Sequence, residues 1–148
     1  MAGDEAKPAL QRLRLLIAED DLQMQTCLSL TLEQEHDIAG VVDNGPDVLH
    51  KVKELSPDII LLDISLPGMS GLHVARQLRR ARDSTRIIFL TGHTEAGYLE
   101  EAARIGAEGY VLKGRARTEL TEAIREVGAG RHYVSPEALK AVASGVTF

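Results

Sequence analysis

The chain has 148 residues, enough for one domain, and 44% of them are hydrophobic. Its net charge of −5 argues against non-specific nucleic-acid binding. A single cysteine, Cys27, excludes an internal disulfide bond and favours a reducing, cytoplasmic location. The apolar runs fall short of the ~18 residues that a membrane span needs, so we expect no membrane association.

Apolar runs of strand length alternate with amphipathic helical patterns along the chain. The pattern predicts strands at residues 13–18, 37–42, 59–62, 87–90 and 109–112. It predicts helices at residues 22–35, 46–55, 72–80 and 95–105, a fifth around 120–127, and a short helix from 135 to about 143. The run at 59–62 is apolar on both faces and indicates a central strand, whereas 37–42 indicates an edge strand. This alternation predicts an α/β fold with a doubly wound parallel sheet.

Acidic, hydroxyl and basic side chains follow most of these strands. They are Glu19, Asp20 and Asp21 after the first strand, Asp63 after the third, Thr91 after the fourth and Lys113 after the fifth. The carboxyl ends of parallel strands share one edge, and ligands bind there where the strand order reverses. Carboxylates suit a hard divalent cation, and a hydroxyl with an ammonium suits a phosphoryl group. We therefore expect one pocket built from residues far apart in the sequence.

Each of these residues also has an ordinary structural interpretation. A helix cap after the first strand explains Asp21, but not three acids in a row. Thr91 alone can be explained as a turn hydroxyl, and Lys113 alone as a solvated lysine. Asp63 is harder to explain, because no helix is expected to begin until about residue 70. Their joint position on one sheet edge favours a functional site.

The remaining reactive residues show no pattern of a catalytic or metal site. The five histidines lack metal-ligand spacing, and no Walker A, GxGxxG or Ser/His/Asp arrangement is present. Cys27 falls at helical spacing with Met24, Leu28 and Leu32, which predicts a core residue of the first helix. The arginines between residues 76 and 86 are interpreted as a solvated face near a helix end.

Four segments of the chain resemble the response-regulator receiver domain of two-component signalling. They are residues 15–21 (LLIAEDD), 57–72 (PDIILLDISLPGMSGL), 89–93 (FLTGH) and 106–113 (GAEGYVLK). The resemblance covers residues 12–130 and implies a flavodoxin-like receiver fold with five strands in the order 2-1-3-4-5. Residues 123–139 are similar to the linker of the NarL/FixJ class of DNA-binding regulators.

The resemblance implies a role for each acid of the expected pocket. Asp63 matches the phosphoacceptor, which attacks a phosphohistidine on a sensor histidine kinase. Asp20 and Asp63 match carboxylates that bind Mg²⁺, and Ser65 matches the residue whose backbone carbonyl is a further ligand. Glu19 matches the acid that contacts the ion through water, although the family more often has Asp at this position.

Two further matches concern the phosphoryl group and the response to it. Thr91 and Lys113 match the groups that bind the phosphoryl oxygens. Thr91 and Tyr110 match the pair that switches the surface of the fourth helix, fifth strand and fifth helix, with homodimerisation as an expected response. A receiver of this kind catalyses only its own phosphorylation and dephosphorylation, so we expect no enzyme acting on separate substrates.

We expect three parts along the chain. Residues 1–11 are expected to be a flexible leader, and the resemblance implies a receiver domain over residues 12–130 and a linker-like tail over residues 131–148, with a short helix and no output domain. We expect a truncated regulator whose C-terminal DNA-binding domain is missing, with a natural stand-alone receiver as the alternative. The chain alone is expected not to bind DNA.

Two other functional classes fit parts of the pattern. A Mg²⁺-dependent phosphohydrolase of the haloacid-dehalogenase type also uses an Asp after a strand, but it needs a second Asp where this chain has Ser65. A flavin-binding module of flavodoxin-like fold would place its phosphate among carboxylates that repel it.

Overall fold

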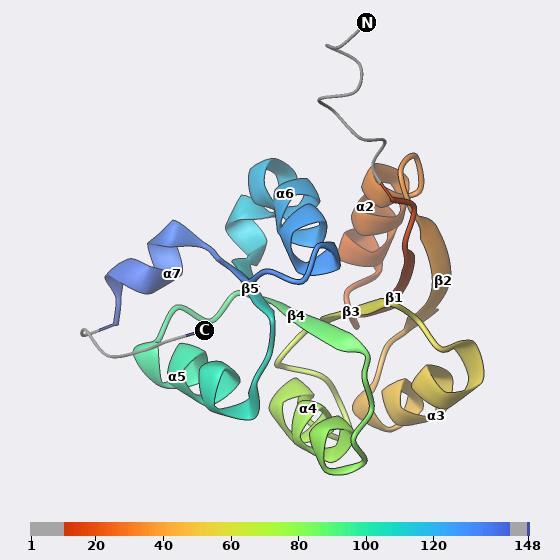
Figure 1. Ribbon diagram of the computed structural model, residues 1–148, viewed down its shortest axis with the longest axis horizontal. Helices are drawn as coiled ribbons and strands as arrows, with labels where there is room; N and C mark the ends of the chain where they lie inside the picture. Colours follow the sequence, from red (N-terminus) through yellow and green to blue (C-terminus); the bar gives the residue numbers. More distant parts are fainter. Residues whose placement is uncertain (1–10, 143–147) are drawn as a thin grey trace, which may run out of the picture.

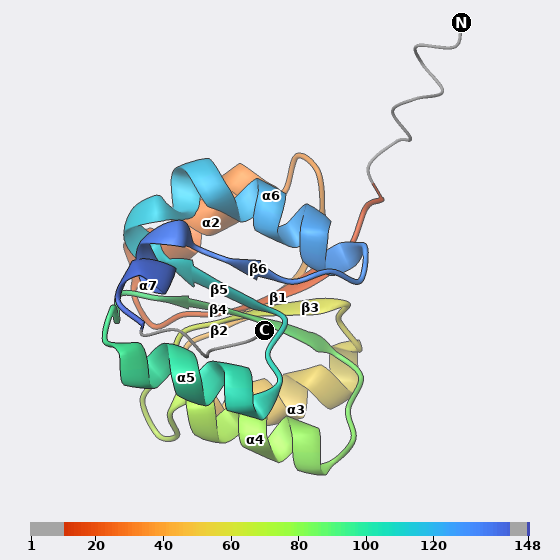
Figure 2. The same ribbon diagram turned by 60° about the vertical axis from the view of Figure 1, so that its left-hand side comes forward.

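The computed structural model describes residues 11–142 and residue 148. Six parallel strands form one sheet in the order β2-β1-β3-β4-β5-β6, with helices on both faces (Figures 1 and 2). The strands are β1 (Arg14–Ala18), β2 (Asp37–Val42), β3 (Ile59–Leu62), β4 (Arg86–Thr91), β5 (Gly109–Leu112) and β6 (Tyr133–Val134). The helices are α2 (Leu22–Leu32), α3 (Gly45–Leu55), α4 (Gly71–Arg80), α5 (Ala96–Ile105), the 3₁₀ turn η1 (Lys113–Arg115), α6 (Ala116–Gly128) and α7 (Pro136–Lys140). The predicted doubly wound parallel sheet is confirmed.

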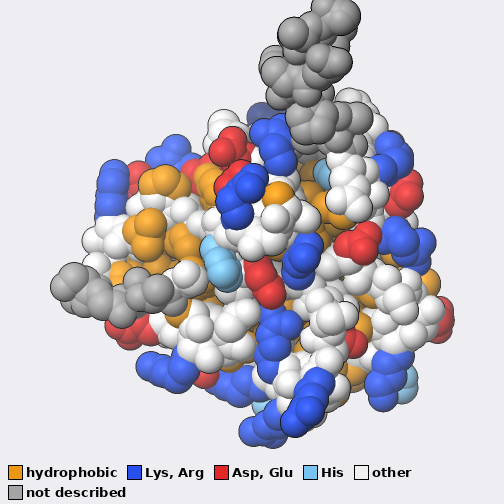
Figure 3. Space-filling view, in the orientation of Figure 1, with side chains coloured by type: hydrophobic (Ala, Val, Ile, Leu, Met, Phe, Trp, Pro, Cys, Tyr) orange, Lys and Arg blue, Asp and Glu red, His pale blue; other side chains and the backbone are white. Residues whose placement is uncertain are grey.

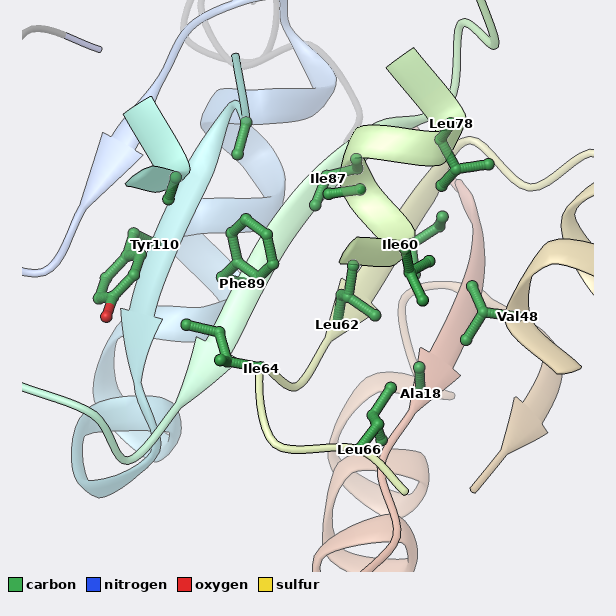
Figure 4. Close-up of a cluster of buried hydrophobic side chains, with 14 of the residues drawn as sticks. Ala18, Val48, Ile60, Leu62, Ile64, Leu66, Leu78, Ile87, Phe89 and Tyr110 are labelled. Carbon is green, nitrogen blue, oxygen red and sulfur yellow. The ribbon is translucent and has the colours of Figure 1, made fainter. Parts of the chain in front are cut away.

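Each face of the sheet carries its own hydrophobic core. Helices α3, α4 and α5 cover one face, and α2 and α6 cover the other, so that the sheet lies between two helical layers (Figure 2). Within β1, Leu16 and Ala18 join the first core, whereas Leu15 and Ile17 join the second. Side chains of the first core converge from β3, β4 and β5 in Figure 4. Burial on both faces explains why the central strands are unbroken apolar runs.

Capping side chains mark where the helices begin. Asp21 accepts hydrogen bonds from the backbone N–H groups of Gln23 and Met24, so its expected role as the cap of α2 is confirmed. Asn44 caps α3 in the same way, with Pro46 in the first turn. These caps fix the chain direction immediately after β1 and β2, and so fix the loops at the carboxyl edge of the sheet.

Two predictions for the first helix are wrong. α2 ends at Leu32 rather than at residue 35, and the Arg12 guanidinium donates to the carbonyls that follow, those of Glu33, Gln34 and His36. Cys27 is exposed rather than buried. Leu28 and Leu32 form the buried stripe, and Cys27 lies about 100° around the helix from Leu28, on the solvent side.

A sixth strand extends the sheet beyond the five strands that were expected. Tyr133 and Val134 pair in parallel with Gly109 and Tyr110, on the edge of β5 that would otherwise be open. Two residues are too few to show an alternating pattern, so the sequence gives no signal for this strand. The predicted short helix is present as α7 and ends at Lys140. Residues 1–10 of the expected leader and residues 143–147 of the tail lie outside the described residues.

Three of the arginines between residues 76 and 86 do not fit a solvated face, and one of them, Arg86, donates from Nη1 to the Gly128 carbonyl at 3.1 Å. Arg76 Nη2 lies 2.7 Å from Glu101 Oε2, which joins α4 to α5. Arg79 Nη2 lies 2.8 Å from Glu108 Oε1, just before β5. Elsewhere, acidic and basic side chains are interspersed over the face shown in Figure 3. Over residues 11–142, the structure holds no helix long and apolar enough to cross a membrane.

Candidate functional site

Three carboxylates meet at the carboxyl edge of the sheet. Carboxylate oxygens of Glu19, Asp20 and Asp63 lie within 4.8 Å of one another. Glu19 and Asp63 are 1% and 4% exposed, whereas Asp20 is exposed. The strand order reverses here, because β1 pairs with both β2 and β3. The structure therefore brings together the acids that were expected in one pocket.

Lys113 bridges the two buried carboxylates. Its Nζ lies 2.8 Å from Glu19 Oε1 and 2.9 Å from Asp63 Oδ2. Burial by itself lowers the pKa of Lys113, but its contacts with Glu19 and Asp63 outweigh burial and raise that pKa. Burial raises the pKa of Glu19, although the Lys113 ammonium and the Asp21 N–H act in the opposite direction. The lysine is therefore held charged, at the point where two carboxylates would otherwise repel.

The donor set of this cluster fits a hard divalent cation. Glu19 Oε1 is the one buried side-chain oxygen or nitrogen of the described residues without a well-aligned hydrogen bond. Its 2.8 Å contact with Lys113 Nζ is an ion pair. The other oxygen of Glu19 accepts from the Asp21 N–H at 3.0 Å. Mg²⁺ binds carboxylate and carbonyl oxygens, so the free lone pairs of Glu19, with Asp20 and Asp63 beside them, match its requirements.

Tight backbone contacts hold Asp63 in place. Its N–H donates to the Ala18 carbonyl at 3.1 Å, and the Gly71 N–H donates to the Ile64 carbonyl at 2.8 Å. A Cβ atom on Gly71 would overlap the Asp63 carbonyl oxygen, so only glycine lets α4 begin this close to the strand end. The Ser65 N–H donates to Asp63 Oδ1 at 3.2 Å, which orients the carboxylate. The loop that follows β3 is thus fixed at both ends.

Thr91 and Tyr110 both contact the backbone of one residue, His93. Thr91, 0% exposed, accepts from the His93 N–H at 3.1 Å through Oγ1. The Tyr110 hydroxyl donates to the His93 carbonyl at 2.9 Å, and its ring is 1% exposed beside Phe89. Burial raises the pKa of Tyr110. The two expected switch residues are therefore linked through a single peptide segment.

His93 itself is a site residue that the sequence did not predict. Its Nε2 lies 2.7 Å from Ser65 Oγ, and its ring stacks on Tyr98 with centroids 4.2 Å apart. The ring thereby connects the loop after β3 to the loop after β4. Metal-ligand spacing along the sequence has no bearing on a contact of this kind, so the pattern of histidines gives no signal for it.

The fold agrees with comparisons to known proteins. The chain belongs to the response regulator receiver domain family, whose model matches residues 15–125. It is the receiver domain of a two-component response regulator, similar to members of the NarL and LuxR groups.

Two relatives show how this chain compares with longer regulators. It is 38% identical to the transcriptional regulatory protein YvfU of Bacillus subtilis over 127 residues, covering 84% of this chain and 64% of that protein. It is 32% identical to the response regulator GacA of Pseudomonas aeruginosa over 127 residues, covering 84% and 59%. The chain thus spans about three fifths of the length of these relatives.

Solved structures confirm the architecture. A two-component response regulator of the LuxR family from Aurantimonas sp. SI85-9A1 superposes with a TM-score of 0.84 at 25% identity, covering 89% of this chain and 96% of that one. A DNA-binding response regulator of the LuxR family from Staphylococcus aureus gives a TM-score of 0.75 at 32% identity, covering 78% and 98%. The flavodoxin-like receiver fold expected from the sequence is confirmed, with β6 as an added strand.

Proposed function

We propose that Asp63 accepts a phosphoryl group from a phosphohistidine on a sensor histidine kinase. The observation that carries the proposal is a buried carboxylate in contact with a fixed ammonium and two further acids. A carboxylate oxygen of Asp63 attacks phosphorus, the P–N bond to the donor imidazole breaks, and its electron pair stays on the imidazole nitrogen. The chain then acts on its own phosphoryl group only, and not as an enzyme with separate substrates.

The pocket residues have complementary parts in this transfer. Glu19, Asp20, Asp63 and the backbone carbonyl of Ser65 would hold Mg²⁺, which would neutralise charge on the phosphoryl oxygens. Lys113 supplies a second positive charge, already directed at Asp63. We assign Thr91 to another phosphoryl oxygen, because its hydroxyl lies at the end of the next strand. Positioning and charge neutralisation are what phosphoryl transfer mainly requires.

The response to phosphorylation is proposed to pass through Thr91 and Tyr110. A hydrogen bond from Thr91 to the phosphoryl group would compete with its present contact to the His93 N–H. The carbonyl of His93 accepts from the Tyr110 hydroxyl, so the surface of α5 and β5 would respond to the change at Thr91. One charge-assisted hydrogen bond, about 1.5–3 kcal/mol, shifts a two-state population roughly 10- to 150-fold. Thr91→Ala should therefore accept phosphate at Asp63 with a weakened change in the amide NMR signals of α5 and β5; an undiminished change would contradict this route.

The wider role is proposed from the relatives. The phosphorylated receiver would form a homodimer, and the longer regulator would control transcription, as the names of its relatives indicate. The acidic net charge of −5 supports the absence of DNA binding by this chain alone. A cytoplasmic location suits a partner kinase domain and a single unpaired cysteine.

Intact-mass measurement after incubation with Mg²⁺ and a small acyl phosphate tests the phosphoacceptor assignment. We expect a single phosphoryl group that is stable to acid, labile to base, and lost when Mg²⁺ is chelated. Asp63→Asn should abolish it. Asp43→Asn is a matched control, because Asp43 also follows a strand on this edge but is exposed. Labelling of Asp63→Asn to the wild-type extent would contradict the assignment of Asp63 as the phosphoacceptor.

A further inference from the structure

The residues Tyr133–Lys140, named here the β6–α7 segment, are attached to the sheet through Ser135. This serine is 0% exposed, and its N–H donates to the Tyr110 carbonyl at 2.8 Å. Its hydroxyl donates to Glu119 Oε1 at 2.5 Å and accepts from the Leu112 N–H at 3.1 Å. Backbone and side chain of one residue thus connect the segment to both β5 and α6.

The Ser135 side chain continues the sheet beyond the point where strand pairing stops. β6 pairs with β5 at two positions, and the second joins Tyr110 to Val134. Parallel pairing over so few residues is a weak attachment. The next N–H of β5 that points toward this edge is that of Leu112, and Ser135 Oγ satisfies it. Ala138 and Val134 pack the segment against the first core, and the serine contacts supply its polar attachment to the end of β5.

This attachment lies one residue from the pocket. Leu112 directly precedes Lys113, whose Nζ is 2.9 Å from Asp63 Oδ2. That distance is already a contact, so a phosphoryl group on this oxygen needs space that the ammonium now fills. A phosphoryl group on this oxygen would push the ammonium outward, and the backbone that precedes Lys113 is the one that Ser135 holds.

We propose that Ser135 is a positioning residue that couples the phosphorylation of Asp63 to the attachment of the β6–α7 segment. In the unphosphorylated chain it holds the end of β5 so that Lys113 reaches the buried carboxylates. Phosphorylation displaces Lys113, lengthens the hydrogen bond from Leu112 to Ser135 and loosens the segment. The inference rests on the proposed function, and it extends the response to residues that follow the last large helix of the receiver.

Backbone hydrogen exchange measured by NMR on the whole 148-residue chain tests this coupling. Spectra are compared with Mg²⁺ alone and with Mg²⁺ plus beryllium fluoride, a phosphoryl mimic. Loss of one net hydrogen bond corresponds to about a 2- to 13-fold change in an opening equilibrium, so exchange at Leu112 and Ser135 should rise within that range. In Ser135→Ala the segment should exchange fast in both states, with less than about a twofold difference between them. Glu137→Ala is the control, because that carboxylate contacts Arg115 and Lys140 at the surface of the same segment, and it should respond as wild type.

Occupancy of the pocket is measured separately, from the fluorine NMR signals of bound beryllium fluoride. A wild-type chain that loads without faster exchange at Leu112 and Ser135 overturns the coupling and leaves the proposed function standing. A wild-type chain that does not load overturns both. If Ser135→Ala binds beryllium fluoride and its segment shows the full wild-type change in exchange, Ser135 does not couple the pocket to the segment. If Ser135→Ala does not fold, Glu119→Ala replaces it. Glu119 is half-buried in α6 and accepts the hydrogen bond of the serine hydroxyl, so its replacement must reduce the response of the segment to beryllium fluoride.

Discussion

Replacing Lys113 by methionine should measure how far the pocket depends on its ammonium group. The side chains of Glu19 and Asp63 are 2% and 5% exposed, and they lie 2.8 and 2.9 Å from Nζ. At an effective dielectric constant of about 20, each contact supplies roughly 6 kcal/mol of Coulomb attraction, most of which desolvation cancels. Removing one partner of such a buried pair costs about 3–5 kcal/mol, because the remaining charges stay buried. The Lys113 side chain is 25% exposed, so water replaces it in part, and we expect a loss near the lower end, about 3 kcal/mol.

Urea unfolding at neutral pH, with Mg²⁺ chelated, gives the free energy of unfolding of the wild type and of Lys113→Met. Lys140→Met is the matched control: that side chain is 73% exposed and 3.3 Å from Glu137, so its loss should change stability by less than about 1 kcal/mol. Added Mg²⁺ should stabilise Lys113→Met more than wild type, because the ion no longer competes with the ammonium. At a free concentration of 100 times Kd it contributes about 2.7 kcal/mol.

The same variant should also differ from wild type in its response to pH. Burial already raises the pKa of Glu19 above its ordinary value of 4.5, and loss of the ammonium raises it further. A group with a raised folded-state pKa contributes stability below its unfolded pKa and loses it as pH rises through the folded one. Lys113→Met should therefore regain stability relative to wild type as the pH falls from 7 toward 5. A variant as stable as wild type without Mg²⁺, with the same pH profile, would refute the ion-pair account.

Two further changes test the scaffold. Gly71→Ala should lower the free energy of unfolding by about 1–3 kcal/mol and weaken Mg²⁺ binding, because the added methyl group displaces the Asp63 backbone. The control is Gly97→Ala, whose methyl group meets no atom within 4 Å and should be neutral or stabilising by up to about 1 kcal/mol. Equal effects of the two variants in urea unfolding would count against the close approach of Gly71 to Asp63. His36, 5% exposed, accepts from the Leu13 N–H at 3.2 Å, and burial lowers its pKa below the ordinary value of 6.5. Its contribution to stability is therefore complete above pH 6.5 and is lost as pH falls from there through the folded-state pKa, with a slope of up to about 1.4 kcal/mol per pH unit. His36→Asn keeps an acceptor without the titration, so its stability should fall less steeply in this range than that of wild type; parallel slopes would show that His36 is not the group responsible.

The sequence alone determined the order of the first five strands and their helices along the chain, and which acids and which lysine follow those strands at the carboxyl edge. The unbroken apolar run Ile59–Leu62 identified a strand buried on both faces, and the polar residue that follows it, Asp63, then had to lie at a sheet edge. These inferences succeed because periodicity and burial are local properties of a chain. The likeness of segments to a known family added the roles of Thr91 and Lys113, and their placement at one edge agrees with it.

Only the tertiary structure decided how these residues meet. Glu19 and Asp20 are neighbours in sequence, yet one is buried against Lys113 and the other is exposed, because the chain turns between them into α2. The strand β6 and the contacts of Ser135 depend on the open edge of β5, which no local pattern in residues 131–140 reveals. Pairings across long sequence separations depend on which edges and faces the rest of the fold leaves available, and that information is absent from any single segment of the chain.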